Sequence, residues 1–225
     1  MPPLGDLLDQ LGEEPSIEAA LGRREPVIAV ADPGRAFVIA GLVAASDRSP
    51  VLVGTPTQAE AERLAADAAA ILGDDKVLHF PAWETLPFER VSPGVETMGQ
   101  RLAVLDRLTS DHPPSLVVAS ARALIQRIDP HATIDPIEVR PGDQVDPVEL
   151  VEQLVMLGYR REGQVEHRGE VAVRGSIVDV YPSTADAPVR IDLWGDEVER
   201  LTEFAVADQR STEPVESARI YPCRE

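Results

Sequence analysis

The chain is poor in cysteine, lysine and aromatic residues: of 225 residues, one is cysteine and 4% are aromatic. The single cysteine, Cys223, cannot form an internal disulfide and leaves no cysteine pair of the kind that zinc motifs need. The histidines lie far apart without metal-ligand spacing. No apolar run has the length of a membrane span, and the first fifteen residues lack the pattern of a signal peptide. We expect a cytoplasmic protein with no metal and no membrane contact.

Positive charge is also scarce, because 39 acidic residues face 21 basic ones and give a formal net charge of −18. Lys76 is the only lysine, so nearly all of the basic residues are arginines. Duplex DNA repels a strongly negative body, and non-specific binding to DNA depends mainly on neutralising its phosphates. We therefore expect little direct DNA binding by this chain.

The first half alternates strand-like and helix-like segments. Apolar runs at 27–31, 51–54, 77–80 and 116–120 predict strands. Helices are expected between them, one of which opens at the capping box Thr57-Gln-Ala-Glu60 and ends at Gly73. Continuous apolar strands that alternate with helices are typical of a parallel sheet covered by helices. The fold class expected for this half is α/β.

The second half has a different pattern, which indicates a smaller α+β domain. Asp146-Pro147-Val-Glu149 is a strong helix start, and Gly158 is expected to end that helix. Antiparallel strands follow, with Gly195-Asp196 as a hairpin turn. We place the domain boundary near 124–130. The final strand-like residues, 218–225, either belong to a longer protein or return to the first sheet.

The turn after the first predicted strand is the place to expect a phosphate loop, since backbone amides and a helix N-terminus can hold phosphate there. A working P-loop needs two separated glycines, a lysine and a hydroxyl residue. The corresponding positions are Ala29, Asp32, Gly34, Arg35 and Ala36, so one of the two glycines, the lysine and the hydroxyl are all replaced. This degenerate P-loop predicts no bound nucleotide and no cofactor.

Catalytic groups are not apparent either. The strand at 116–120 ends without the acidic pair that would hold a metal or activate water, and no Ser-His-Asp or Cys-His set can be assembled. Asp196 and Glu197 lie in a predicted turn, where solvated carboxylates are common. We predict no catalytic residue.

The segment 158–182, GYRREGQVEHRGEVAVRGSIVDVYP, is the most informative part of the chain. It holds Arg160, Arg161, Arg168 and Arg174 among interleaved glutamates and β-rich runs. An arginine on a rigid strand can present its planar fork to a partner's carboxylate. The competing interpretation is a solvated hairpin with incidental arginines, which composition alone favours.

Four stretches of this sequence resemble the N-terminal region of bacterial transcription-repair coupling factors (Mfd), which is itself similar to the nucleotide-excision-repair protein UvrB. They are FPAWETLP at 80–87, SARALIQRIDP at 120–130, the arginine-rich segment 158–182 and VRIDLWGDEVERLTEFAVADQRS at 189–211. The resemblance implies a UvrB-like α/β domain at 1–126, an α+β docking domain at 127–212, and the start of a return to the first domain at 213–225.

The function that the resemblance implies is recruitment of UvrA to stalled RNA polymerase. Arg161 and Arg174 fall where UvrB places arginines that contact UvrA, and Val178 is a candidate for an apolar contact. A further family arginine falls on Ala172 and is absent here. Arg160 and Arg168 have no such counterpart and are expected to be solvated.

Two departures limit what the resemblance implies. The loop at 29–36 aligns with UvrB's true P-loop but is degenerate, and the segment between Phe80 and Met98 is too short for UvrB's aromatic DNA-inserting hairpin. The family's ATP-dependent DNA translocase and its polymerase-binding domain have no counterpart in these 225 residues, so this part is expected not to be an enzyme. The alternative is a UvrB-type domain that binds nucleotide or damaged DNA.

Overall fold

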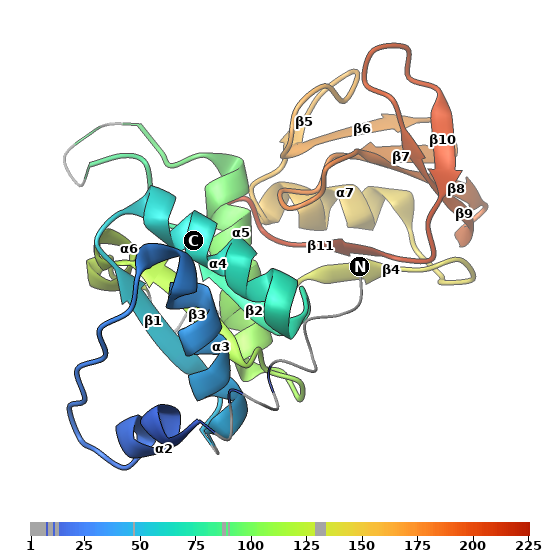
Figure 1. Cartoon of the computed structure of the whole chain (residues 1–225). Coiled ribbons are helices and arrows are strands. Elements are labelled where there is room, and N and C mark those ends of the chain that lie inside the picture. Colours follow the sequence, from blue (N-terminus) through green and yellow to red (C-terminus); the bar gives the residue numbers. More distant parts are fainter. Residues whose placement is uncertain are drawn as a thin grey trace. The chain divides into compact units, whose positions relative to one another are not determined.

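The structure is a computed structural model that describes residues 14–46, 48–86, 91–128 and 134–225, together with Leu8, Leu11 and Glu89. Its contacts divide the chain into two compact units. The first consists of residues 1–82 and 104–127, and the second of residues 83–103 and 128–225. Each unit is described by itself (Figure 1).

The first unit surrounds a three-stranded parallel sheet. The strands are β1 (Val51–Thr55), β2 (Val77–Phe80) and β3 (Leu116–Ser120), in the order β1-β3-β2. The helices are α2 (Pro15–Leu21), α3 (Arg35–Ala45), α4 (Gln58–Leu72) and α6 (Ala121–Ile125), preceded at α3 by the 3-10 turn η1 (Asp32–Gly34). Helix α5 (Val95–Thr109) contributes residues to both units.

Both faces of β3 are covered, which explains why all five of its residues are buried. Leu116 and Val118 pack into a core with α3 and α4, whereas Val117 and Ala119 pack into another with Val104 of α5. Since successive strand residues point to opposite faces, a continuous apolar run is what a doubly covered strand requires. The predicted α/β class with a parallel sheet is therefore confirmed for this unit.

One predicted strand is wrong. Residues 27–31 have no regular secondary structure, and Val27 and Ile28 are exposed although their side chains are apolar. Periodicity alone could not show that these residues form no strand, because an apolar run predicts burial but does not reveal whether a neighbouring strand is there to pair with. Residues 32–36 accordingly follow an irregular segment rather than a strand.

The second unit contains a helix and eight strands among its described residues. The helix is α7 (Pro147–Met156). The strands are β4 (Ile137–Val139), β5 (Arg160–Arg161), β6 (Glu170–Arg174), β7 (Ile177–Val180), β8 (Val189–Trp194), β9 (Glu197–Phe204), β10 (Ser211–Pro214) and β11 (Ala218–Ile220).

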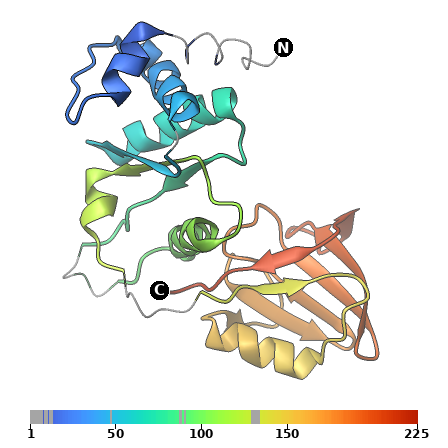
Figure 2. The ribbon, with the colours of Figure 1, turned by 90° about the horizontal axis from the view of Figure 1, so that it is seen from below.

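Six of these strands form one sheet in the order β10-β9-β8-β7-β6-β5, antiparallel except for the β5–β6 pair. Helix α7 runs alongside this sheet (Figure 2) and packs Leu150, Val151 and Leu154 against it. Alternate strand residues, among them Val171 and Ile191, meet the helix in one core. The sheet thus has an inner face toward α7 and an outward face away from it.

Local signals in this unit are confirmed. The Asp146 side chain accepts hydrogen bonds from the backbone N–H groups of Val148 and Glu149 and caps α7. Gly158 follows the helix at φ 96°, and Gly195 forms the β8–β9 turn at φ 64°. Both glycines adopt the left-handed region that side chains disfavour.

The segment at 213–225 lies in the second unit. Strand β11 pairs antiparallel with β4 rather than with the three-stranded sheet, so the expected return to that sheet is not what the structure shows. Ile220 and Ala218 are buried in the α7 core, which stabilises the segment in this unit. The boundaries 1–126, 127–212 and 213–225 stay a prediction, and residues 83–103 join the second unit.

Cys223 provides a test of this core. Its side chain is 3% exposed, and burial raises the pKa of the thiol to about 11. With this pKa, roughly one thiol in a thousand is ionised at about pH 8, and only the ionised thiolate reacts. We expect a chromogenic disulfide reagent to react with the native chain at least about a hundredfold more slowly than with the urea-unfolded chain. Cys223→Ser is the blank, and equal rates in both states would contradict the burial.

Candidate functional site

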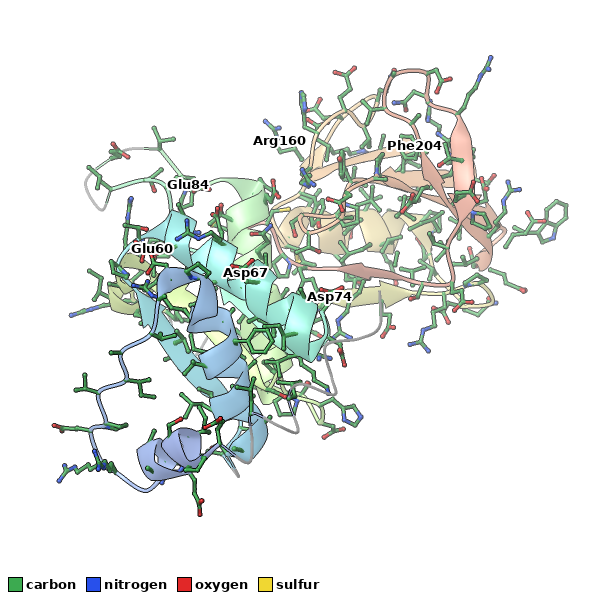
Figure 3. The ribbon with its side chains drawn as sticks, in the orientation of Figure 1. Glu60, Asp67, Asp74, Glu84, Arg160 and Phe204 are labelled. Atoms are coloured by element: carbon green, nitrogen blue, oxygen red, sulfur yellow. The ribbon has the colours of Figure 1, made fainter. Side chains whose placement is uncertain are left out.

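A hollow of about 290 Å³ lies where the degenerate loop meets α4. Its walls include Asp32, Pro33, Arg35, Ala36, Thr55, Glu60, Arg63, Leu64 and Asp67. Figure 3 labels Glu60 and Asp67 on α4. Three carboxylates thus face two guanidinium groups, and one of these, Arg35, is already paired with Asp32 at 2.8 Å. A phosphate would meet net negative charge here.

The loop residues also lack the backbone geometry of a phosphate cradle. Gly34 has φ −89°, in the right-handed region, and Ala29 is exposed in the irregular segment. Ala36 is buried in α3 and offers no hydroxyl. These positions supply neither a left-handed turn nor the cation and hydroxyl that a P-loop uses.

The carboxyl ends of the parallel strands, where α/β sheets usually bind ligands, are occupied by Gln58. Its Oε1 accepts hydrogen bonds from the Ala82 N–H at 3.2 Å and the Ser120 hydroxyl at 3.3 Å. Its Nε2 lies 3.3 Å from His79 Nε2, and burial lowers the pKa of that imidazole despite the nearby Glu62. The side chain of Gln58 therefore joins β2 and β3 where a ligand would bind.

The part of the chain that the structure describes holds no cluster of three or more residues able to bind a metal ion. Within the same residues, each helix is too short or too polar to cross a bilayer.

The arginine-rich segment contributes to the outward face of the six-stranded sheet. We define the outward face by the side chains that point away from α7. They include Arg160 of β5, Glu170, Ala172 and Arg174 of β6, Ile177 and Asp179 of β7, Arg190, Asp192 and Trp194 of β8, and Arg200, Thr202 and Phe204 of β9. Each is paired across the strands with, or lies two residues from, another member of the face.

Asp179 holds two arginines on this face. It is fully buried, and Arg190 donates to it from Nε at 2.7 Å and from Nη2 at 3.0 Å. Arg174 donates to the same carboxylate from Nη2, while 42% of its side chain stays exposed. These bonds with Asp179 raise the pKa of Arg190 above its ordinary value, against the effect of its own burial. Arg174 thus presents to solvent a guanidinium that is bonded on one side to Asp179.

Arg160, rather than Arg161, shares this face with Arg174. Arg160, which is labelled in Figure 3, pairs in register with Glu170 and contacts its carboxylate at 3.2 Å. Arg161 is in register with Val171, whose side chain enters the α7 core, so alternation directs Arg161 to the other side of the sheet. It is exposed there on an edge strand. The structure therefore does not bring Arg161 and Arg174 together on one face.

Two further expectations about this segment are wrong. Arg168 is not merely solvated: it donates to the Ala185 carbonyl at 2.8 Å, contacts Glu96 and Asp186, and lies over the Tyr181 ring. Val178 cannot contact a partner directly, because its side chain is 0% exposed in the α7 core. The alternation along β7 could have shown this, since Val178 lies one residue before the outward-facing Asp179.

Trp194 is a residue of this face that was not predicted from the sequence. This side chain is 80% exposed at the end of β8, two residues beyond Asp192 on the outward face. A large aromatic surface open to water is unusual and often marks a binding site. Its position could have indicated this, because Trp194 lies just before the Gly195 turn and, by two-residue alternation, on the same face as Arg190 and Asp192.

Comparisons with known proteins agree with this geometry. Residues 137–225 match the UvrB interaction domain. The transcription-repair-coupling factor of Mycobacterium tuberculosis is 38% identical over 218 residues, 93% of this chain and 17% of the relative. The proteins of the same name in Bacillus subtilis and Escherichia coli are 31% and 32% identical, over 91% and 81% of this chain and 17% and 16% of theirs.

The match to the UvrB interaction domain covers residues 137–225 and leaves residues 1–136 outside it. The matched stretch contains the whole six-stranded sheet and its outward face. The full chain is homologous to part of the transcription-repair-coupling factors and spans less than a fifth of the length of these relatives. The predicted resemblance is confirmed at this level.

Glu170 provides a test of how the segment before β6 is held. Burial alone raises the pKa of this carboxyl, but hydrogen bonds from the N–H groups of Glu166 and His167, at 2.8 and 2.9 Å, together with nearby positive charge, lower it below its ordinary value. The ionised form is therefore favoured in the folded state. Its contribution to the free energy of unfolding is present above the ordinary value of 4.5 and is lost as the pH falls through the lower, folded-state pKa.

We expect Glu170→Gln to reduce the free energy of unfolding at neutral pH and the difference from wild type to shrink on acidification. Urea titrations followed by circular dichroism, at several pH values down to about 3, measure this difference. Glu162→Gln, a change in an exposed glutamate of the same segment, serves as the control. A difference that stays constant with pH would show that the Glu170 charge is not favoured by folding.

Proposed function

We propose that the outward face docks UvrA and that the chain recruits UvrA to stalled RNA polymerase in nucleotide excision repair. The observation that carries this proposal is an arginine, Arg174, held by the buried Asp179 with much of its side chain open to solvent. The family name, with its reference to UvrB interaction, supports protein binding as the role of this domain. In this proposal the chain is a non-catalytic module of the cytoplasm.

The chemistry of the outward face fits a partner that offers carboxylates. One hydrogen of Arg174 Nη2 is bonded to Asp179, which leaves the second Nη2 hydrogen, together with one other guanidinium nitrogen, as a free edge among the described residues. A guanidinium with one side fixed can donate two parallel hydrogen bonds to an incoming carboxylate. Nucleic acid is disfavoured as the partner, because the formal charge of −18 repels its phosphates. Arg160 lies at the β5 edge of this surface and would act at its rim, whereas Arg161 of the same edge strand points to the other side of the sheet.

The alternative, a domain that binds nucleotide or damaged DNA, has less support. The hollow beside α4 has more carboxylates than guanidinium groups, and Gln58 occupies the strand ends. Any phosphate bound by Arg35 would also lie near the Asp32 carboxylate that pairs with this arginine, which would repel it.

The main test concerns Arg174. We expect Arg174→Ala to weaken binding to purified UvrA about tenfold or more, because truncation of one partner of a desolvated charge pair costs about 2–5 kcal/mol. Arg161→Ala should weaken it by about threefold or less, since Arg161 points away from the outward face and a charge outside the contact mainly changes the association rate. Calorimetry or surface plasmon resonance at fixed salt measures both.

Arg140→Ala is the matched control. Arg140 is also an exposed arginine paired with a carboxylate, Glu138 at 2.6 Å, but it follows β4 outside the six-stranded sheet. This variant should bind UvrA like wild type. Loss of binding in Arg140→Ala together with full binding in Arg174→Ala would place the docking surface elsewhere.

We propose Trp194 as the apolar contact of the same surface. Val178, the candidate expected from the sequence, is buried. Tryptophan and arginine are the residue types that most often dominate binding energy at protein interfaces. Trp194 and Arg200 flank the Asp192 carboxylate, which accepts from Arg200 at 2.7 Å. An indole beside fixed charges gives a partner an apolar surface next to defined polar positions.

Trp194→Ala should weaken UvrA binding about tenfold or more without changing the urea midpoint, because the lost side chain contacts water in the free protein. Met156→Ala is the control, since this exposed side chain belongs to α7 on the other side of the sheet. Its affinity should stay at the wild-type value. Unchanged affinity in Trp194→Ala would exclude the indole from the interface.

A further inference from the structure

We infer that Asp179 is a positioning residue for partner binding, which fixes the Arg174 guanidinium in the orientation that a partner carboxylate meets. This inference rests on the proposed docking function. Asp179 itself cannot touch a partner, because it is 0% exposed. Its effect must therefore pass through the arginines that it holds.

The position of Asp179 is itself set by Arg190. Arg190 lies directly across from Asp179 in the β7–β8 register and binds both carboxylate oxygens. The Arg190 guanidinium is held in turn by the Gln209 carbonyl at 3.1 Å and by the Phe204 ring at 4.8 Å. All three nitrogens of Arg190 thus have acceptors, and its side chain is nearly buried.

The loop that supplies the Gln209 carbonyl is also fixed. Gln209 has φ 60°, a left-handed conformation that is unfavourable for a residue with a side chain. Its Nε2 donates to the carbonyls of Val165 and Val206, at 3.1 and 2.9 Å. A chain of contacts therefore runs from this loop through Arg190 and Asp179 to Arg174.

Arg174 is the exposed end of that chain. Without Asp179, the side chain would sample many rotamers, and a partner would have to order it on binding. If net charge alone set the affinity for an acidic partner, loss of the Asp179 charge would strengthen binding instead of weakening it. Two arginines and one aspartate leave one positive charge, whereas Asp179→Asn would leave two and would attract an acidic partner more strongly. The sign of the change in affinity therefore separates positioning from simple charge.

The experiment is a double-mutant cycle with Arg174→Ala and Asp179→Asn, measured against purified UvrA at one salt concentration. We expect Asp179→Asn to weaken binding about fivefold or more, which corresponds to ordering one long side chain. In the Arg174→Ala background the same substitution should have no further effect, since the residue through which it acts is gone.

A second measurement needs no partner. Rotation of the Arg174 guanidinium about its Nε–Cζ bond, followed by nitrogen NMR in the free chain, should be slow in wild type and fast in Asp179→Asn. If Asp179→Asn does not fold, Asp179→Glu keeps the charge but displaces the carboxylate by one methylene. It should then show the same loss of affinity and the same faster rotation.

The outcomes distinguish the inference from the proposed function. No binding of UvrA by the wild-type chain would overturn the proposed function. Binding by wild type with equal or tighter binding by Asp179→Asn would overturn the inference alone. So would an equal loss from Asp179→Asn with and without Arg174, because a general structural effect does not depend on that residue.

Discussion

The two-residue alternation of the six-stranded sheet is the constraint on which the docking surface depends. Every second side chain along a strand enters the core with α7. The side chains between them therefore point away from the helix, toward solvent or toward loops that cover the sheet. On β7 this rule buries Val178 and Val180 toward the helix and directs Asp179 outward between two arginines. A shift of one residue would exchange these roles and would place a carboxylate in the apolar core.

Much of the fold follows from local signals in the sequence. Asp146 and Pro147 start α7, Thr57 caps α4, and Gly195 makes the tight β8–β9 turn, because each residue type has a specific backbone or capping property. The strand predicted at 27–31 fails for a different reason. A strand forms only where another strand lies beside it, and the local sequence of residues 27–31 does not indicate whether one does.

The site was predictable in part. The sequence and the family resemblance predict that it lies in 158–182 and that Arg174 belongs to it. They do not decide between Arg160 and Arg161, because that choice depends on the register of a two-residue strand, β5, against β6. Arg190 and Trp194 lie outside the segment and join it only through the β7–β8 pairing. Sheet register, rather than sequence proximity, thus sets the membership of the face.

The burial of Asp179 also determines which arginine can act in recognition. A buried carboxylate without a cation is strongly destabilising, and Arg190 alone supplies bonds to both of its oxygens. Removal of Arg174 would therefore leave Asp179 paired, whereas removal of Arg190 would leave it with a single, half-exposed partner. The structural requirement falls on Arg190, which is nearly buried, so Arg174 is free to vary or to bind. Stability and recognition are in this way assigned to two different arginines of the same ion cluster.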